Sequence, residues 1–127
     1  MSVPFDPIAS AIVVRARLWG PDADVVARLA LDTGATFSLV NREVLTFLGY
    51  DPEAASVAVD IATASGVVSV SQIAVEKIES LGKELWNFPV LCHTLPPSAT
   101  VDGLLGLDFL RGQRLVVDFR AGAIALD

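Results

Sequence analysis

Apolar and polar residues alternate along much of the chain, which is the pattern of β-strands that bury one face. Turn-forming residues separate these runs, and Thr63–Gly66 is predicted as the tip of one hairpin. A short apolar stretch around Leu104 adds a further strand. The other predicted strands are Ser10–Trp19, Val25–Leu31, Phe37–Val40, Ser56–Ala62, Val67–Ile78, Glu84–Leu91, Leu115–Phe119 and Ala123–Leu126.

Two short helices are expected between the strands. Asn41 is a good N-cap for a helix over Arg42–Leu48, which Gly49 ends. The second helix is predicted at Leu107–Leu110. With about nine strands, two short helices and no long linker, the chain is expected to be all-β, a closed or nearly closed barrel. At 127 residues, the whole chain (1–127) fits a single domain.

Composition narrows the range of partners and cofactors. The net charge of −6, with no cluster of basic residues, disfavours nucleic acid and anionic membrane surfaces. No apolar run is long enough to span a bilayer, and the first residues do not resemble a secretory signal, so a cytoplasmic location is expected. Cys92 is the only cysteine and His93 the only histidine, so we predict no disulfide, no metal site and no cofactor.

The triplet Asp32-Thr33-Gly34 follows an apolar run and occurs once in the chain. Two carboxylates about 3 Å apart can share a proton and activate a water molecule, because both cannot ionise comfortably. One Asp cannot do this alone, and no other Asp lies in an Asp-Thr-Gly or Asp-Ser-Gly context. The second carboxylate is therefore expected from an identical chain, in a homodimer with its active site on the two-fold axis. Part of the high apolar content, 53%, is then expected at the subunit interface.

Other interpretations of Asp32 predict different chemistry. The residue can be a turn Asp that accepts a backbone N–H. A phosphoaspartyl enzyme of the haloacid dehalogenase type also places Asp before Thr-Gly, but it needs an acid two positions later, where this chain has Gly34. The chain contains no Gly-x-Ser-x-Gly, no phosphate-binding Gly-Lys loop and no Gly-x-Gly-x-x-Gly.

Three segments, taken in order, resemble the retropepsin-like aspartic proteases, the single-domain relatives of pepsin found in retroviruses and, as stand-alone genes, in bacteria. Leu31–Thr36 is similar to the catalytic loop of that family, Thr63–Gly66 to its flap tip, and Asp102–Leu110 to its apolar-apolar-Gly turn with the following helix. The resemblance extends over most of the chain, from about Ser10 to Leu126.

The resemblance implies an aspartic endopeptidase that hydrolyses extended polypeptide substrates as a homodimer. Asp32, Thr33 and Gly34 would form the catalytic triplet, with the Thr33 hydroxyl bonding the loop of the partner. One Asp32 would take a proton from water while its protonated mate donates to the carbonyl oxygen, so activity should be bell-shaped in pH. The residues expected to contact substrate are Ala35, Thr36, Ala64, Ser65, Gly66, Leu104 and Leu105, with Val67 as a further apolar candidate.

Several positions depart from the retroviral pattern. The predicted flap tip has only Gly66 where retroviral members are rich in glycine. Pro4 and Pro7 cannot donate to an interlaced sheet of terminal strands, so the dimer interface is expected to differ. The helix after Gly106 reads Leu107-Asp108-Phe109, where several retroviral members have an Arg, and either a structural role or substrate contact is open to Asp108. The rival function is a non-catalytic dimeric β module that binds extended peptide or mediates assembly.

Overall fold

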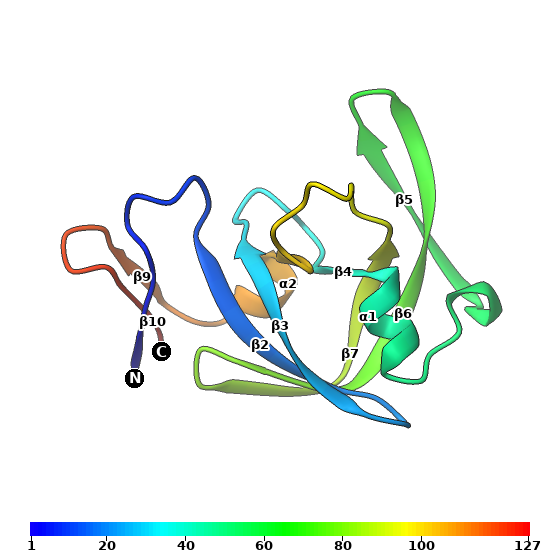
Figure 1. Ribbon diagram of the computed structural model, residues 1–127, viewed down its shortest axis with the longest axis horizontal. Coiled ribbons are helices and arrows are strands. Elements are labelled where there is room, and N and C mark those ends of the chain that lie inside the picture. Colours follow the sequence, from blue (N-terminus) through cyan, green and yellow to red (C-terminus); the bar gives the residue numbers. More distant parts are fainter.

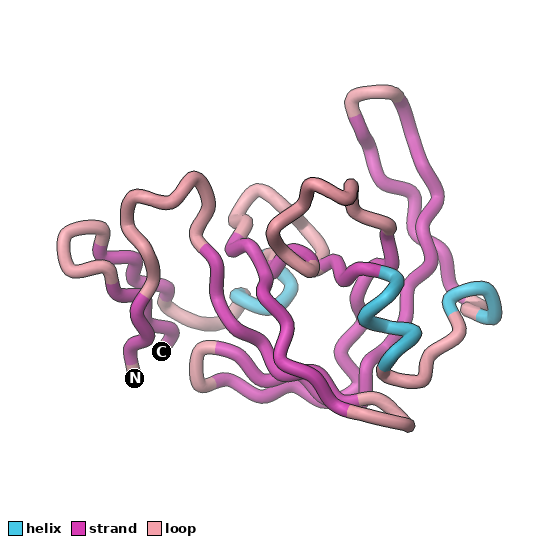
Figure 2. The backbone as a smooth tube through the Cα atoms, in the orientation of Figure 1, coloured by secondary structure: helices cyan, strands magenta, loops and turns pink.

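The computed structural model describes all 127 residues and consists mostly of strands, with only short helical segments (Figures 1 and 2). Every strand expected from the alternation is present, with ends shifted by a few residues. The helices are α1 (Arg42–Phe47) and α2 (Leu107–Leu110), with a 3-10 turn at Pro52–Ala54. The strands are β1 (Ser2–Pro4), β2 (Val13–Trp19), β3 (Asp24–Leu31), β4 (Leu39–Asn41), β5 (Val57–Thr63), β6 (Gly66–Ser80), β7 (Lys83–His93), β8 (Gly103–Leu105), β9 (Leu115–Asp118) and β10 (Ala123–Leu126).

The long strand β6 closes the barrel because its two ends have different neighbours. Its first half pairs with β5, and its last four residues, Lys77–Ser80, pair with β2. The strands β2-β3-β8-β4-β7-β6 thus form a ring of six, which β5 extends outside the barrel. Figure 1 shows the β5–β6 hairpin standing away from the barrel. The predicted all-β class, with a closed barrel and two short helices, is confirmed.

Strand β8 lies between β3 and β4 and positions the segment that carries the Asp-Thr-Gly triplet. It runs parallel to β3, with Leu31 opposite Leu105, and antiparallel to β4, with Val40 opposite Gly103. A side chain at Gly103 would not fit, because its Cβ would lie 1.9 Å from the carbonyl oxygen of Leu39. This close packing fixes both ends of the loop 32–38 against the end of β8.

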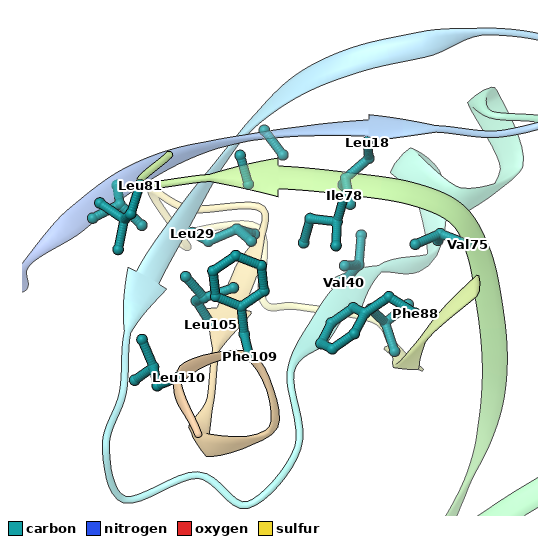
Figure 3. Packing of buried hydrophobic residues seen from close by; sticks show 14 of the residues in the cluster. Leu18, Leu29, Val40, Val75, Ile78, Leu81, Phe88, Leu105, Phe109 and Leu110 are labelled. Carbon is teal, nitrogen blue, oxygen red and sulfur yellow. The ribbon is translucent and has the colours of Figure 1, made fainter. Parts of the chain in front are cut away.

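The main core fills the barrel. It is a cluster of 21 buried residues, many of them drawn in Figure 3. Phe109 of α2 is fully buried at its centre and meets Phe88 edge to face, with ring centroids 5.9 Å apart. A smaller cluster of Leu39, Val70 and Leu91 lies where the β5–β6 hairpin meets the barrel. The hairpin is thus attached to the barrel by an apolar contact of its own.

A separate three-stranded sheet joins the two ends of the chain, in the order β1-β10-β9. The sequence pattern did not reveal β1, which is only three residues long and contains Pro4. Pro4 is tolerated because β1 is an edge strand of this sheet. The pairing lies within one chain, with Ser2 opposite Ala125. Just beyond β1, the backbone N–H of Phe5 donates to the carbonyl of Gly122 and extends the contact.

The expected cap of α1 is present. The Asn41 side chain accepts a hydrogen bond from the backbone N–H of Glu43, and Gly49 follows the helix with a positive φ of 103°. The 3-10 turn was not predicted, although Asp51 caps it in the same way and Pro52 begins it. Neither α-helix has the length or the apolar character that crossing a membrane would require.

Candidate active site

Asp32 lies in a tight turn directly after β3. Its backbone N–H donates to the carbonyl oxygen of Leu105 (2.9 Å), and its own carbonyl accepts from Ala35. One carboxylate oxygen, Oδ1, accepts the backbone N–H of Gly34 at 2.9 Å. The residue is half-buried, while Thr33 and Gly34 beside it are exposed. The turn therefore holds the carboxylate by backbone groups and leaves it at the edge of solvent.

Gly34 contributes to this geometry by being small. A Cβ at this position would lie 3.2 Å from Oδ1 of Asp32, the same oxygen that Gly34 holds through its N–H. A side chain there would crowd the carboxylate that the backbone positions. Glycine at the third position of the triplet thus allows the backbone to come close to the functional group.

The far side of the loop is braced by the start of α2. The backbone N–H of Leu107 donates to the carbonyl of Ala35, and that of Asp108 donates to the carbonyl of Thr36. Gly106 makes this approach possible, because a Cβ there would lie 2.8 Å from the Ala35 oxygen. The loop is therefore held along its length by backbone contacts with residues about seventy positions later.

A buried hydrogen-bond network completes the brace. Ser38 is fully buried, and its backbone N–H and its hydroxyl both donate to the Asp108 carboxylate, the hydroxyl at 2.7 Å. The Ser38 hydroxyl oxygen in turn accepts the backbone N–H of Gly106 at 2.9 Å. The Asp108 carboxylate is thus bound to Ser38 behind the loop. Of the two roles that the sequence left open for Asp108, this contact supports the structural one. Nothing in the sequence around Ser38 pointed to its part in the site.

Replacing Asp108 by Asn is expected to lower the free energy of unfolding by about 2 kcal/mol, because an amide presents only one acceptor to the donors of Ser38. Urea denaturation of both proteins measures this loss. The exposed Asp22, which has no side-chain hydrogen bond, provides the control Asp22→Asn, expected within about 0.5 kcal/mol of wild type. Equal stability of the two variants would show that the network contributes nothing.

A cavity of about 430 Å³ opens between this loop and the β5–β6 hairpin. Four of the residues predicted from sequence line it together, namely Gly34, Ala35, Thr36 and Leu104. The other lining residues were not expected from the sequence, and they are Phe37, Leu39, Asp60, Ile61, Ala62 and Leu91. The signal that could have indicated them is their place in the chain, because they belong to the strands that flank the loop and to the hairpin. The cavity is mostly apolar, with one carboxylate at Asp60.

The remaining predicted substrate residues lie elsewhere. Leu105 is fully buried in the main core, where its side chain is out of reach of the cavity, and only its carbonyl serves the site by binding Asp32. Ala64, Ser65 and Gly66 form the exposed tip of the β5–β6 hairpin and do not line the cavity. Val67 is 73% exposed and does not line it either.

The tip is a tight turn with its own side-chain support. Thr63 pairs with Gly66 across the hairpin, and the Thr63 hydroxyl donates to the carbonyl of Gly66 at 2.8 Å. Gly66 has a φ of 126°, a backbone conformation that is accessible mainly to glycine. The single glycine of the tip is therefore used to close the turn.

The sequence matches the family model described as aspartyl protease over residues 14–109, a range that holds the Asp32 turn, the hairpin and most of α2. The chain belongs to the aspartyl protease family. This membership indicates protease chemistry based on Asp carboxylates. A search of curated proteins gives no match to this aspartyl protease.

Among solved structures, this aspartyl protease is similar to a retropepsin-like aspartic protease from Rickettsia conorii, described by its crystal structure. The TM-score is 0.75 at 20% sequence identity, and the match covers 99% of this chain and 89% of the other. At this identity the likeness concerns the fold, and it agrees with the retropepsin-like barrel expected from the sequence.

Other chemistry has little support in the rest of the molecule. No group of three or more His, Cys, Asp and Glu side chains is placed to hold a metal ion. Cys92 is buried in the main core, and this burial raises the pKa of its thiol, which keeps the nucleophilic thiolate scarce. The Asp32 turn is therefore the feature of this aspartyl protease that best fits a catalytic centre.

Proposed function

We propose that two copies of this aspartyl protease assemble with their Asp32 turns facing each other and hydrolyse peptide bonds in extended polypeptides. The observation that carries this proposal is the single Asp-Thr-Gly turn, which holds a half-buried carboxylate by the backbone N–H of Gly34 and presents exposed Thr33 beside it. One such carboxylate cannot both activate water and protonate the substrate. A second copy supplies the missing partner.

In the proposed mechanism the pair holds one proton. The ionised Asp32 takes a proton from the attacking water, and the protonated Asp32 of the partner subunit donates to the carbonyl oxygen of the scissile bond. The Thr33 hydroxyl of each chain bonds the loop of the other and keeps the carboxylates in register. Activity depends on a singly protonated pair, so its pH profile is bell-shaped.

The cavity beside the turn would hold the substrate. Gly34, Ala35, Thr36 and Leu104 provide its wall on the barrel side. Strand β5 pairs only with β6, so its other edge is free to add an extended peptide as a further strand. The hairpin tip, Ala64–Gly66, would close over that peptide and exclude water. The apolar lining favours substrates with apolar side chains near the scissile bond.

Exposed apolar side chains support an assembly of two chains. Val116 of β9 is 44% exposed, and Phe119, in the turn directly after β9, is 59% exposed. Strand β9 also has a free edge, since it pairs only with β10. We place part of the interface on this sheet, with the Thr33 contacts forming another part around the two-fold axis.

Mixing wild-type chains with Asp32→Asn chains tests whether both carboxylates act in one site. In an equal mixture whose subunits exchange freely, about a quarter of the dimers carry two Asp32 residues, so peptide hydrolysis per total chain falls to about a quarter. Sedimentation analysis of the same samples verifies that dimers form.

A site complete within one chain would instead retain about half of the activity in that mixture. Activity proportional to the wild-type fraction, or a wild-type protein that stays monomeric while it cleaves peptides, would refute the shared site. The rival function, a non-catalytic module, predicts that wild-type and Asp32→Asn proteins bind extended peptides equally and that neither cleaves them.

A further inference from the structure

Two arginines face each other on the outer side of the barrel. Arg15 of β2 and Arg28 of β3 are directly opposite in the antiparallel pair, and both side chains are exposed. Like charges at such positions destabilise a sheet. The four ion pairs of the protein involve other cations, and neither Arg15 nor Arg28 has a carboxylate within ion-pair distance. In a chain of net charge −6, these two neighbouring arginines therefore have no ion pair.

Two carboxylates near this pair, those of Asp102 and Asp6, are engaged by backbone groups. Asp102 accepts the backbone N–H of Arg28 at 2.9 Å, and Asp6 accepts the backbone N–H of Ile8 at 3.1 Å. One nitrogen of the Arg28 guanidinium donates to the carbonyl of Thr100 at 2.7 Å. The guanidinium of Arg15 makes no hydrogen bond within the chain, so donors of both arginines remain free for an external acceptor.

The two arginines line a cavity with a volume of about 590 Å³. Its other walls include Asp6 and the apolar side chains of Val3, Val13 and Leu81. The cavity lies beside β2, where the N-terminal segment rises along the barrel (Figure 1). It shares no lining residue with the cavity next to the Asp32 turn. Its size falls within the range of about 300–1,000 Å³ that is usual for small-molecule sites.

We propose that this cavity is a second binding site, which takes a carboxylate attached to an apolar group. Arg15 and Arg28 hold the carboxylate, for which the planar guanidinium has matching donors. Val3, Val13 and Leu81 cover the apolar part. A monoanion fits better than a phosphate, because the carboxylates of Asp6 and Asp102 offset part of the positive charge of the two arginines. The carboxylate can come from the C-terminus of a peptide or from an acidic side chain.

Titration with small probes tests the site. N-acetyl-leucine carries an α-carboxylate, N-acetyl-leucinamide lacks the charge, and the amidated peptide acetyl-Leu-Glu-NH2 carries its carboxylate on a side chain. We expect at least one of the two acids to bind, with backbone amide NMR shifts at Val13, Arg15 and Arg28, and the uncharged amide to bind about 10-fold more weakly or not at all. The acid that binds identifies the source of the carboxylate.

Arg15→Gln is the decisive variant, because its side chain supports nothing else in the structure. We expect it to weaken binding of the acid about 10-fold or more, while the melting temperature of the free protein stays the same or rises because like-charge repulsion is removed. Arg120→Gln removes one exposed positive charge elsewhere and should leave binding unchanged. Asp32→Asn should also leave it unchanged, so a failure of the proposed protease site does not affect this test.

Three results would overturn the proposal. The first is that neither acid binds to the wild-type protein. The second is that the acids and N-acetyl-leucinamide bind with equal affinity, which would mean that only apolar contact matters. The third is that Arg15→Gln binds the acid as tightly as Arg120→Gln does, which would place the carboxylate away from the arginine pair.

Discussion

Asp32→Asn is expected to lower the turnover rate for a mixed peptide library by about 10³-fold or more, because the amide can neither take a proton from water nor share one with its mate. The fold should persist, since the Asn side-chain oxygen can accept the N–H of Gly34 as Asp32 does at 2.9 Å. Mass spectrometry of the library measures cleavage. Circular dichroism and sedimentation verify the fold and the assembly.

Asp22→Asn is the matched control, because it removes one exposed carboxylate far from the loop 32–38 and should leave the turnover rate within about 2-fold of wild type. An Asp32→Asn protein that retains more than about a tenth of wild-type turnover would contradict a catalytic role for this carboxylate. Loss of assembly in the variant would instead show that Asp32 is needed at the interface.

Gly103→Ala is expected to lower the free energy of unfolding by about 3 kcal/mol or more, because the new methyl group meets backbone rather than a movable side chain. Its Cβ would lie 1.9 Å from the carbonyl oxygen of Leu39 and 3.0 Å from the Cα of Val40. Strands β4 and β8 would have to separate. The loop 32–38 joins β3 to β4, and both of these strands pair with β8, so hydrolysis should fall together with stability. Urea denaturation measures the first effect.

Gly112→Ala separates this clash from backbone strain. Gly112 has a φ of 81°, and a Cβ there meets nothing within 4 Å, so only the cost of a positive φ remains, about 1 kcal/mol. Similar losses in the two variants would mean that β8 relaxes away from Leu39 at little cost. The close packing of β8 would then not be required for the site.

The strands could be predicted from sequence because alternation is a local signal, and this held for β2, β3, β5 and β10 within a few residues. A barrel was expected as well, but the pairing of strands that closes it could not be predicted. The run Val67–Ile78 was recognised as one strand, but its exchange of partners from β5 to β2 depends on a register set by residues far away. Strand β1 escaped notice because three residues with a proline carry no periodicity.

In the candidate site, too, local features could be predicted from the sequence and long-range contacts could not. The Asp32 turn was recognisable because three consecutive residues define it. The role of Ser38 could not be recognised in the sequence, because it depends on Asp108, which lies seventy residues later and comes close only in the folded chain. Leu104 and Leu105 were indistinguishable in the sequence, but neighbours on a strand face opposite sides, so one lines the cavity and the other is buried in the core.

The pairing of Ser2 with Ala125 also bears on how the chain folds during its synthesis. The six barrel strands all lie between Val13 and Leu105, so the barrel can close before β9 and β10 have been synthesised. Strand β1 has no partner until β10 emerges. Strand β1 therefore stays unpaired until β10 has been made, so we expect the sheet of β1, β10 and β9 to form after the barrel.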